Sequence, residues 1–359
     1  MLVNFPSAAP PPAPKGVLLV RLCNWVGEVV LSLPALRRLA ADGYDLRLYG
    51  KGWSTALFEG AGWPVIVRHG CYRTAAEQLR EMRQALGSDR SPALLMTNSF
   101  SSALEMRLAG FAPSGYAREG RSPLLRHAFR LPRFPHAAHA YWHLAGCFLG
   151  SSEPFPAPVN WVPSDAQHRQ ALALLAQHGL AANAFVMLCP FSGSDDRKNR
   201  KVWPGFRELA TALHAANVQV VVCPGPGDEV AAAAWPAIAV CLSGVDLGVY
   251  GAMQKLASIV VANDTGPGHL AAAAGAQLIS ILGPQSVAAW APIGPNVQIV
   301  QETAKWPTVA GIIALIMDVN SWPETCNSSW LQPKKSRRPP FEFVPEAALL
   351  SRRAARTVR

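Results

Sequence analysis

The chain alternates short, wholly apolar runs with longer segments in which apolar residues recur every three or four positions. Runs such as residues 16–20 (GVLLV) and 278–282 (LISIL) are short, rich in branched aliphatic residues and typical of buried strands in a parallel sheet. The longer segments, such as residues 164–178, have the period of amphipathic helices. Alternating strands and helices predict βαβ units, and therefore an α/β fold with parallel sheets.

This alternation occurs twice along the chain. The first block has expected strands at residues 16–20, 46–49, 65–67 and 94–96, with helices carrying Leu31, Leu36 and Leu39 and spanning residues 74–86. The second block has expected strands at residues 185–188, 218–223, 259–261 and 278–282, with helices at 164–178, 206–214 and 267–274. The proline-rich stretch 154–163 lacks periodicity, so we predict one Rossmann-like domain over residues 16–160 and a second over 161–320.

The two ends of the chain differ from the body in composition. Residues 1–15 form a proline-rich leader that we expect to be disordered, and residues 321–359 carry half of the formal net charge of +10. That basic tail suits either transient contact with anionic lipids of the inner membrane or a solvated, disordered end. No signal peptide and no spanning helix are expected, which predicts a cytoplasmic protein that can lie at the inner-membrane surface. Nucleic acid is not an expected partner, because no known binding module accompanies the charge.

The segment 263–270 (NDTGPGHL) follows a predicted strand and opens a helix of small residues. A helix start presents free backbone N–H groups and the positive end of a helix dipole, which suits a phosphate. The candidate residues for binding a diphosphate are Asp264, Thr265, Gly266, Pro267 and His269. The structural alternative is a capped helix start, with Asp264 or Thr265 as the cap and His269 held in the core.

Two other loops follow predicted strands of the second domain. The loop 192–201 opens with the small residues Ser192, Gly193 and Ser194 and ends with Lys201, which can neutralise leaving-group charge; a solvated charged loop is the alternative. In the loop 224–229, Asp228 or Glu229 can bind ribose hydroxyls, although an ordinary strand-to-helix turn fits equally well. Neither loop has the Gly-Lys-Ser/Thr ending of a Walker motif.

In the first domain, Glu28 lies at a predicted helix start directly after the first strand. Its carboxylate can take a proton from an acceptor hydroxyl, or it can simply complement the helix dipole. Residues 16–27 lack a GxGxxG turn, which disfavours a dehydrogenase.

Taken in order over roughly residues 16–317, six segments together resemble glycosyltransferase family 9, the lipopolysaccharide heptosyltransferases. The segments are 18–21 (LLVR), 25–34 (WVGEVVLSLP), 97–104 (TNSFSSAL), 201–204 (KVWP), 263–272 (NDTGPGHLAA) and 282–284 (LGP). The resemblance implies the GT-B fold, with two Rossmann-like domains whose parallel sheets face an interdomain cleft. It also implies inverting transfer of heptose from ADP-L-glycero-D-manno-heptose to the lipopolysaccharide inner core.

The same resemblance implies roles for particular residues. Glu28 would be the catalytic base, and Lys201 would stabilise the departing ADP without a metal or other cofactor. The loop residues named above, from Ser192 to His269, would bind the nucleotide sugar. The lipopolysaccharide-core acceptor would be bound by the first domain, where Asn98 and Ser99 belong to the matching segment 97–104. The other acceptor-binding candidates, Arg126 and Arg130, come from a basic stretch of the first domain. This stretch can receive the phosphates of a lipid A core, and an exposed helix face is the alternative; its other members are Arg121, His127, Arg133 and His136.

The chain departs from the family pattern at two positions. Glu28 stands where the family usually has Asp, and Val202 stands where it usually has Arg beside the lysine. These departures keep two other functions open. One is transfer of another nucleotide sugar in polysaccharide assembly, and the other is nucleotide-sugar binding by a non-catalytic paralogue.

Overall fold

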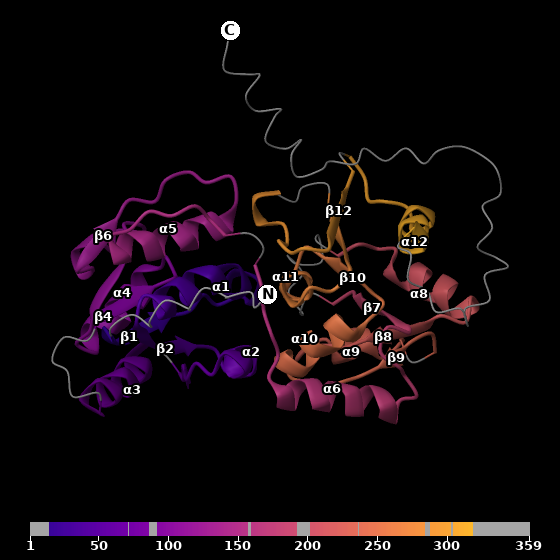
Figure 1. Ribbon diagram of the computed structural model, residues 1–359, viewed down its shortest axis with the longest axis horizontal. Coiled ribbons are helices and arrows are strands. Elements are labelled where there is room, and N and C mark those ends of the chain that lie inside the picture. The colour runs from indigo at the N-terminus through magenta and orange to yellow at the C-terminus, as the bar shows by residue number, and fades with distance from the viewer. Residues whose placement is uncertain are drawn as a thin grey trace, which may run out of the picture. The chain divides into compact units, whose positions relative to one another are not determined.

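The computed structural model describes residues 14–70, 72–85, 92–156, 159–191, 202–235, 237–283, 288–302 and 304–318. The chain divides into two compact units, Met1–Pro156 and Ala157–Arg359, and the division falls a few residues before the predicted boundary at residue 160. The leader up to residue 13 and the basic tail lie outside the described residues. Figure 1 labels most of the helices and strands of the two units.

Unit 1 is built on a parallel six-stranded sheet in the order β3-β2-β1-β4-β5-β6. Its strands are β1 (Gly16–Arg21), β2 (Tyr44–Gly50), β3 (Val65–Val67), β4 (Pro92–Leu95), β5 (Ala112–Tyr116) and β6 (His127–Phe129). Its helices are α1 (Val26–Ala41), α2 (Ser54–Phe58), α3 (Tyr72–Ala85), α4 (Phe100–Leu108) and α5 (Ala137–Leu149), with short 3-10 turns η1 (Glu59–Ala61) and η2 (Ser122–Leu124).

Helices cover both faces of this sheet, because side chains of a strand alternate between the faces. Leu19 and Leu95 pack against α3 and α4 in one buried cluster, together with Met106 and Phe111. Helix α1 packs against α5. Arg38 on α1 reinforces this pairing, since its guanidinium lies over the ring of Trp142 on α5 at 4.4 Å.

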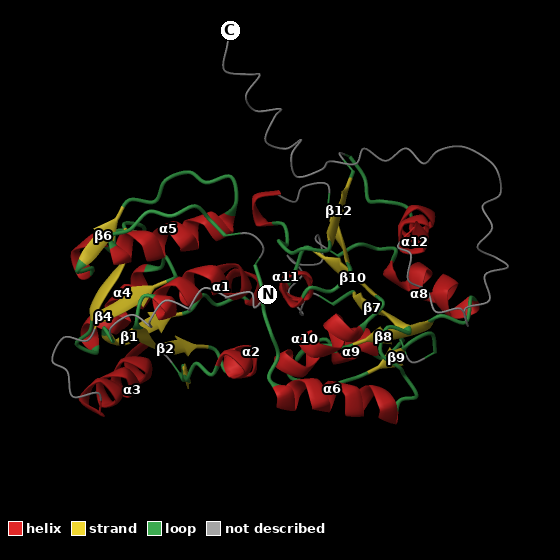
Figure 2. Cartoon of the chain, in the orientation of Figure 1, coloured by secondary structure: helices red, strands yellow, loops and turns green. Residues whose placement is uncertain are grey.

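Unit 2 repeats the plan with a parallel sheet in the order β12-β11-β10-β7-β8-β9. Its strands are β7 (Phe185–Cys189), β8 (Gln219–Val222), β9 (Val240–Cys241), β10 (Ile259–Asn263), β11 (Leu278–Leu282) and β12 (Val297–Gln301). Its helices are α6 (Asp165–Gln177), α8 (Phe206–Ala215), α9 (Glu229–Ala232), α10 (Leu247–Leu256), α11 (Gly266–Ala274) and α12 (Val309–Asp318), with the 3-10 turn η3 (Ala288–Trp290). Figure 2 shows the alternation of helix and strand in each unit.

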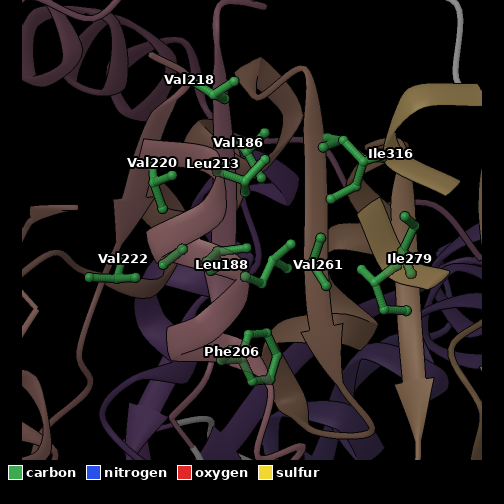
Figure 3. Packing of buried hydrophobic residues seen from close by; sticks show 14 of the residues in the cluster. Val186, Leu188, Phe206, Leu213, Val218, Val220, Val222, Val261, Ile279 and Ile316 are labelled. Atoms are coloured by element: carbon green, nitrogen blue, oxygen red, sulfur yellow. The ribbon is translucent and has the colours of Figure 1, made fainter. Parts of the chain in front are cut away.

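One buried apolar cluster of unit 2 lies between this sheet and helices α8 and α12. Figure 3 shows Val186, Leu188 and Val261 of the strands packed with Phe206 of α8 and Ile316 of α12. All five side chains are almost completely removed from water, which is the main stabilising contribution to such a layer. The α/β fold with parallel sheets, as predicted from the alternating pattern, is confirmed.

Both sheets have the same strand order when the strands are counted within each unit, and this order is that of the doubly wound nucleotide-binding fold. In unit 1 the order reverses between β1 and β4, and in unit 2 it reverses between β7 and β10. Open α/β sheets bind ligands at the carboxyl ends of the strands at this switch point. The two switch points are therefore where functional side chains are to be sought.

No helix in the part of the chain that the structure describes is long and apolar enough to cross a membrane.

Candidate functional site

Glu28 lies at the switch point of unit 1, in the first turn of the helix that follows β1. Burial raises the pKa of its carboxyl group, and a hydrogen bond from the backbone of Trp25 partly offsets this. A glutamate at the third helical position that bonds back to the residue before the helix is half of a capping box. The side chain thus has a capping role in addition to the dipole interaction expected from the sequence, and its half-buried carboxyl group lies at the switch point; its role as a base stays a prediction.

Two buried groups that the sequence did not single out lie near Glu28. Cys23 donates from Sγ to the carbonyl of Met96 at 3.3 Å, and the hydroxyl of Tyr141 on α5 lies within hydrogen-bonding distance of the same sulfur at 3.4 Å. Burial raises the pKa of Cys23 to about 12, with a further contribution from the charge of Glu28. Burial also raises the pKa of Tyr141, and the charges of Cys23 and Glu28 add to the effect. The sequence gives little indication that Tyr141 lies near Glu28, because helix α5 follows a long irregular connection whose path the pattern does not predict.

Asn98 and Ser99 lie on the other side of the same switch point, after β4. Ser99 caps α4, because its Oγ accepts a hydrogen bond from the backbone N–H of Ser102. Asn98 is exposed, and its Oδ1 accepts a hydrogen bond from Arg121 at 3.4 Å. The structure therefore brings Asn98 and Ser99 to the same sheet edge as Glu28, which leaves acceptor binding a prediction with a suitable position.

The basic stretch from Arg121 to Arg133 contains the short 3-10 turn η2 and the strand β6, and it does not form an exposed α-helix face. Arg121 is fully buried and donates to the carbonyls of Thr97 and Tyr116, so the prediction that it receives acceptor phosphates is wrong. Arg126 and Arg130 are exposed, but they flank the edge strand β6 and do not lie on a helix face. Strand β6 is three strands from β1, which is about 14 Å at the usual spacing of roughly 4.8 Å. Their role toward the acceptor stays a prediction.

The switch point of unit 2 contains the turn from β10 into α11. Thr265 is the residue before the helix, yet its side chain makes no capping hydrogen bond. Its Oγ1 is buried and has no partner among the described residues. The capping interpretation of Thr265 is therefore not observed. The Thr265 hydroxyl and the first-turn N–H groups of Gly266 and Gly268, which have no partner within the helix, suit an anionic ligand, and diphosphate binding here stays a prediction.

Glycine is required at position 268 for close packing. A Cβ atom there would lie 2.8 Å from the backbone oxygen of Asn263, which is closer than real Cβ contacts allow. The start of α11 is thereby held against the end of β10.

Asp264 and His269 support the turn from inside. Both are buried, and His269 Nε2 lies 3.9 Å from Asp264 Oδ1. Pro267 is held in place by a hydrogen bond, because the buried side-chain amide of Gln254 on α10 donates to its carbonyl at 3.0 Å. Asp264 and His269 therefore shape the turn, and direct donor contacts by either residue stay predictions.

Asn263, the last residue of β10, connects this turn to the loop that follows β7. Its Oδ1 accepts from the backbone N–H of Trp203 at 2.9 Å, and its Nδ2 donates to the carbonyl of Cys189 at 3.5 Å. Both ends of the loop between β7 and α8 are thus fixed beside the turn from β10 into α11. Lys201 and the predicted residues Ser192, Gly193 and Ser194 belong to that loop and lie outside the described residues.

The turn after β8 satisfies much of its own polarity. Glu229 is exposed and accepts at Oε1 from the backbone N–H of Gly227, and its hydrogen bonds to the backbone lower its pKa. Asp228 is buried, and its carboxylate lies close to Gly225. Glu229 therefore behaves as part of an ordinary turn in this structure, while ribose binding by either carboxylate stays a prediction. Across the described residues, no three His, Cys, Asp or Glu side chains form a group that could hold a metal ion.

Comparison with known proteins places these features in a family. Residues 79–310 match the profile of glycosyltransferase family 9 (heptosyltransferase). The chain belongs to glycosyltransferase family 9. No curated protein sequence matches the chain significantly.

Solved structures support the family 9 assignment at the level of the fold. The chain is similar to ADP-heptose lipopolysaccharide heptosyltransferase II of E. coli, with a TM-score of 0.67 and 23% identity over 84% of this chain and 98% of that one. It is similar to a family 9 glycosyltransferase of Veillonella parvula DSM 2008, with a TM-score of 0.73 and 16% identity over 85% and 97%. It is also similar to E. coli heptosyltransferase WaaC with ADP, with a TM-score of 0.66 and 20% identity over 85% and 100%. The GT-B fold implied by the family resemblance is confirmed.

Proposed function

We propose that this family 9 glycosyltransferase moves heptose from ADP-L-glycero-D-manno-heptose to the inner core of lipopolysaccharide, with inversion at the anomeric carbon. The observation that carries the proposal is the turn at the switch point of unit 2, where the buried Thr265 hydroxyl has no partner among the described residues and does not cap α11. Such a turn suits a diphosphate. The solved WaaC structures contain ADP or ADP-2-deoxy-2-fluoro heptose, which supports an ADP-linked donor.

In the proposed reaction, Glu28 takes the proton of the acceptor hydroxyl as its oxygen attacks C1 of the heptose. The bond between C1 and the β-phosphate oxygen breaks, and ADP departs with the bonding electrons. The raised pKa of Glu28 makes it a stronger base than an exposed carboxylate. Negative charge grows on the β-phosphate, where the N–H groups of Gly266 and Gly268, with Lys201, would stabilise it; fixed donors of this kind usually give the largest part of the acceleration.

Donor identity, acceptor and metal dependence can be tested in one assay. Purified protein is incubated with a labelled ADP-, GDP- or UDP-sugar and a truncated lipopolysaccharide-core acceptor, with and without EDTA. We expect transfer from ADP-heptose alone, at equal rates with and without the chelator, and a product with the inverted anomeric configuration. Transfer only from a GDP- or UDP-sugar would replace the proposed donor, and loss of activity in EDTA would contradict metal-independent chemistry.

A non-catalytic nucleotide-sugar binder is the second candidate. It is favoured by the hydrogen bond that Glu28 accepts from the backbone of Trp25, because that contact alone would preserve an acidic residue here. ADP binding without turnover on any donor and acceptor pair would support the binder.

A further inference from the structure

Two aromatic rings are exposed at the switch point of unit 1, which is the edge where open α/β sheets bind their ligands. Trp25 follows β1 and is 56% exposed, and Phe100 follows β4 and is 45% exposed. The loops that carry them are tied together, because the N–H of Met96 donates to the carbonyl of Arg21 at 3.0 Å and Cys23 Sγ donates to the carbonyl of Met96. The rings thus stand on neighbouring, mutually fixed loops at one edge of the sheet.

An exposed asparagine accompanies each ring, and a buried arginine orients each asparagine. Arg21 donates to Oδ1 of Asn24 at 3.0 Å, and Arg121 donates to Oδ1 of Asn98 at 3.4 Å. Both arginines are buried, while both asparagines are exposed. Each amide oxygen accepts from an arginine, and each exposed asparagine also carries an Nδ2 group that can donate to a ligand.

A cation completes the set. Lys51 follows β2, the neighbour of β1 on its other side, and its Nζ lies 5.3 Å from the ring centre of Trp25. The side chain is exposed, so its charge can meet a ligand that lies on the indole.

We propose that Trp25, Phe100, Asn24, Asn98 and Lys51 form a carbohydrate platform that binds the acceptor glycan through a sugar ring carrying an anionic substituent. The apolar C–H face of a pyranose ring fits the negative face of an indole or phenyl ring. The two outward amides donate to its hydroxyl groups, and Lys51 pairs with a phosphate or carboxylate on the same or the next sugar. This inference rests on the proposed function for the identity of the ligand as an acceptor, and it assigns the pairing with the anionic substituent to Lys51, whose Nζ lies 5.3 Å from the ring centre of Trp25, in place of Arg126 and Arg130.

The side chains make a sugar a better occupant than a protein surface. A protein-binding patch is typically a larger contiguous apolar area, whereas here single rings alternate with amides and one ammonium group. Glu28, at the same strand end, adds an acceptor for a sugar hydroxyl.

The test measures glycan affinity separately from turnover. Binding of a phosphorylated inner-core oligosaccharide to the full chain is measured by calorimetry, and the KM values for acceptor and ADP-heptose are measured alongside. We expect Trp25→Ala to weaken glycan binding and raise the acceptor KM about tenfold, as loss of one aromatic contact would. Trp25→Phe should restore most of the affinity, and the KM for ADP-heptose should stay unchanged in both variants.

Isosteric variants test the amides and the cation. Asn24→Asp and Asn98→Asp keep the oxygen that faces the arginine and remove the outward donor, so each should weaken binding by roughly threefold to tenfold. Lys51→Ala should abolish most of the preference for the phosphorylated glycan over the same glycan treated with phosphatase. If the ligand's charge comes from carboxylates alone, the wild-type protein should bind native and phosphatase-treated glycan equally. It should then prefer the native glycan over carboxyl-reduced glycan, and Lys51→Ala should abolish most of that preference. Leu108→Ala, which alters an exposed apolar residue at the opposite end of α4, serves as the matched control.

Unchanged glycan affinity in Trp25→Ala, or equal losses of donor and acceptor affinity, would overturn the platform. Its failure is distinguishable from failure of the proposed function: a wild-type protein that binds the glycan through Trp25 but transfers no sugar refutes only the latter. Active transfer with an acceptor KM indifferent to Trp25 refutes only the platform.

Discussion

Replacing Asn263 by alanine removes the side chain that connects the turn from β10 into α11 to the loop after β7. Asn263 is completely buried, and its Oδ1 is the acceptor for the backbone N–H of Trp203 at 2.9 Å. In the alanine variant that N–H stays buried without an acceptor. The second hydrogen bond of the Asn263 side chain, from Nδ2 to the carbonyl of Cys189 at 3.5 Å, is long and contributes little to stability.

The magnitude follows from the desolvation of one donor. A buried N–H left without a partner costs about 1–3 kcal/mol. For a unit of this size, each kcal/mol lowers the unfolding temperature by roughly 2–4 °C, so the unfolding temperature should fall by roughly 2–12 °C. Trp203 lies two residues after Lys201, which we propose stabilises the departing ADP. A displacement of about 1 Å near reacting groups costs on the order of 100-fold in rate, so we expect the kcat of Asn263→Ala to fall by up to that factor.

The assay compares thermal unfolding and kcat of Asn263→Ala with those of Asn296→Ala. Asn296 is a matched control, because its Nδ2 also donates to a backbone carbonyl, that of Gly275 at 3.0 Å, but in an exposed position. We expect the control to stay within about 1 kcal/mol of the wild-type protein and to keep its activity. Equal stability and equal kcat in the two variants would refute the bridging role of Asn263.

Three further outcomes are expected. Because burial raises the pKa of Glu28, the stability contributed by this group is fully present below its ordinary value of 4.5 and is lost as the pH rises through the folded value; Glu28→Gln should therefore flatten the decline of urea-unfolding free energy above pH 4.5, and an unchanged pH profile would count against burial of the carboxyl. Gly268→Ala should destabilise the protein by about 1–3 kcal/mol and weaken ADP binding measured by calorimetry, since the new Cβ would lie 2.8 Å from the backbone oxygen of Asn263, whereas Gly52→Ala, whose Cβ would meet only Val67 at 3.7 Å, should leave ADP binding unchanged. Cys23 and Cys189, whose pKa values burial raises to about 12 and about 11, should resist iodoacetamide at pH 8 in the native protein, and mass spectrometry that finds either one rapidly alkylated would contradict their burial.

The pattern of apolar runs predicted the strands that are buried on both faces. It did not predict strands whose sequences lack such a run. Strand β5 has the sequence APSGY, and proline and glycine argue against an internal strand. Its place is decided by parallel pairing with β4 and β6 and by Arg121, which packs against Gly115 and donates to the carbonyl of Tyr116. These contacts join residues that no local window relates.

The positions of site residues that directly follow strands could be predicted from the sequence. The roles of residues that depend on tertiary packing could not. The positions of Glu28 and Asp264 after β1 and β10 follow from the βαβ pattern, because parallel strands end at one edge. The bridging role of Asn263, the approach of Tyr141 to Cys23 and the burial of Arg121 could not be read from spacing, since each requires the tertiary arrangement. Arg121 also shows that a basic stretch need not be a charged surface.

The turnover number of Glu28→Gln at saturating ADP-heptose and saturating acceptor tests the central chemical claim most directly. Glutamine keeps the size of the side chain and an oxygen for the backbone of Trp25, but it cannot take a proton. We predict a kcat lower by about 100-fold to 10,000-fold, with unchanged affinity for ADP. A kcat within twofold of the wild-type value would contradict the assignment of Glu28 as the base.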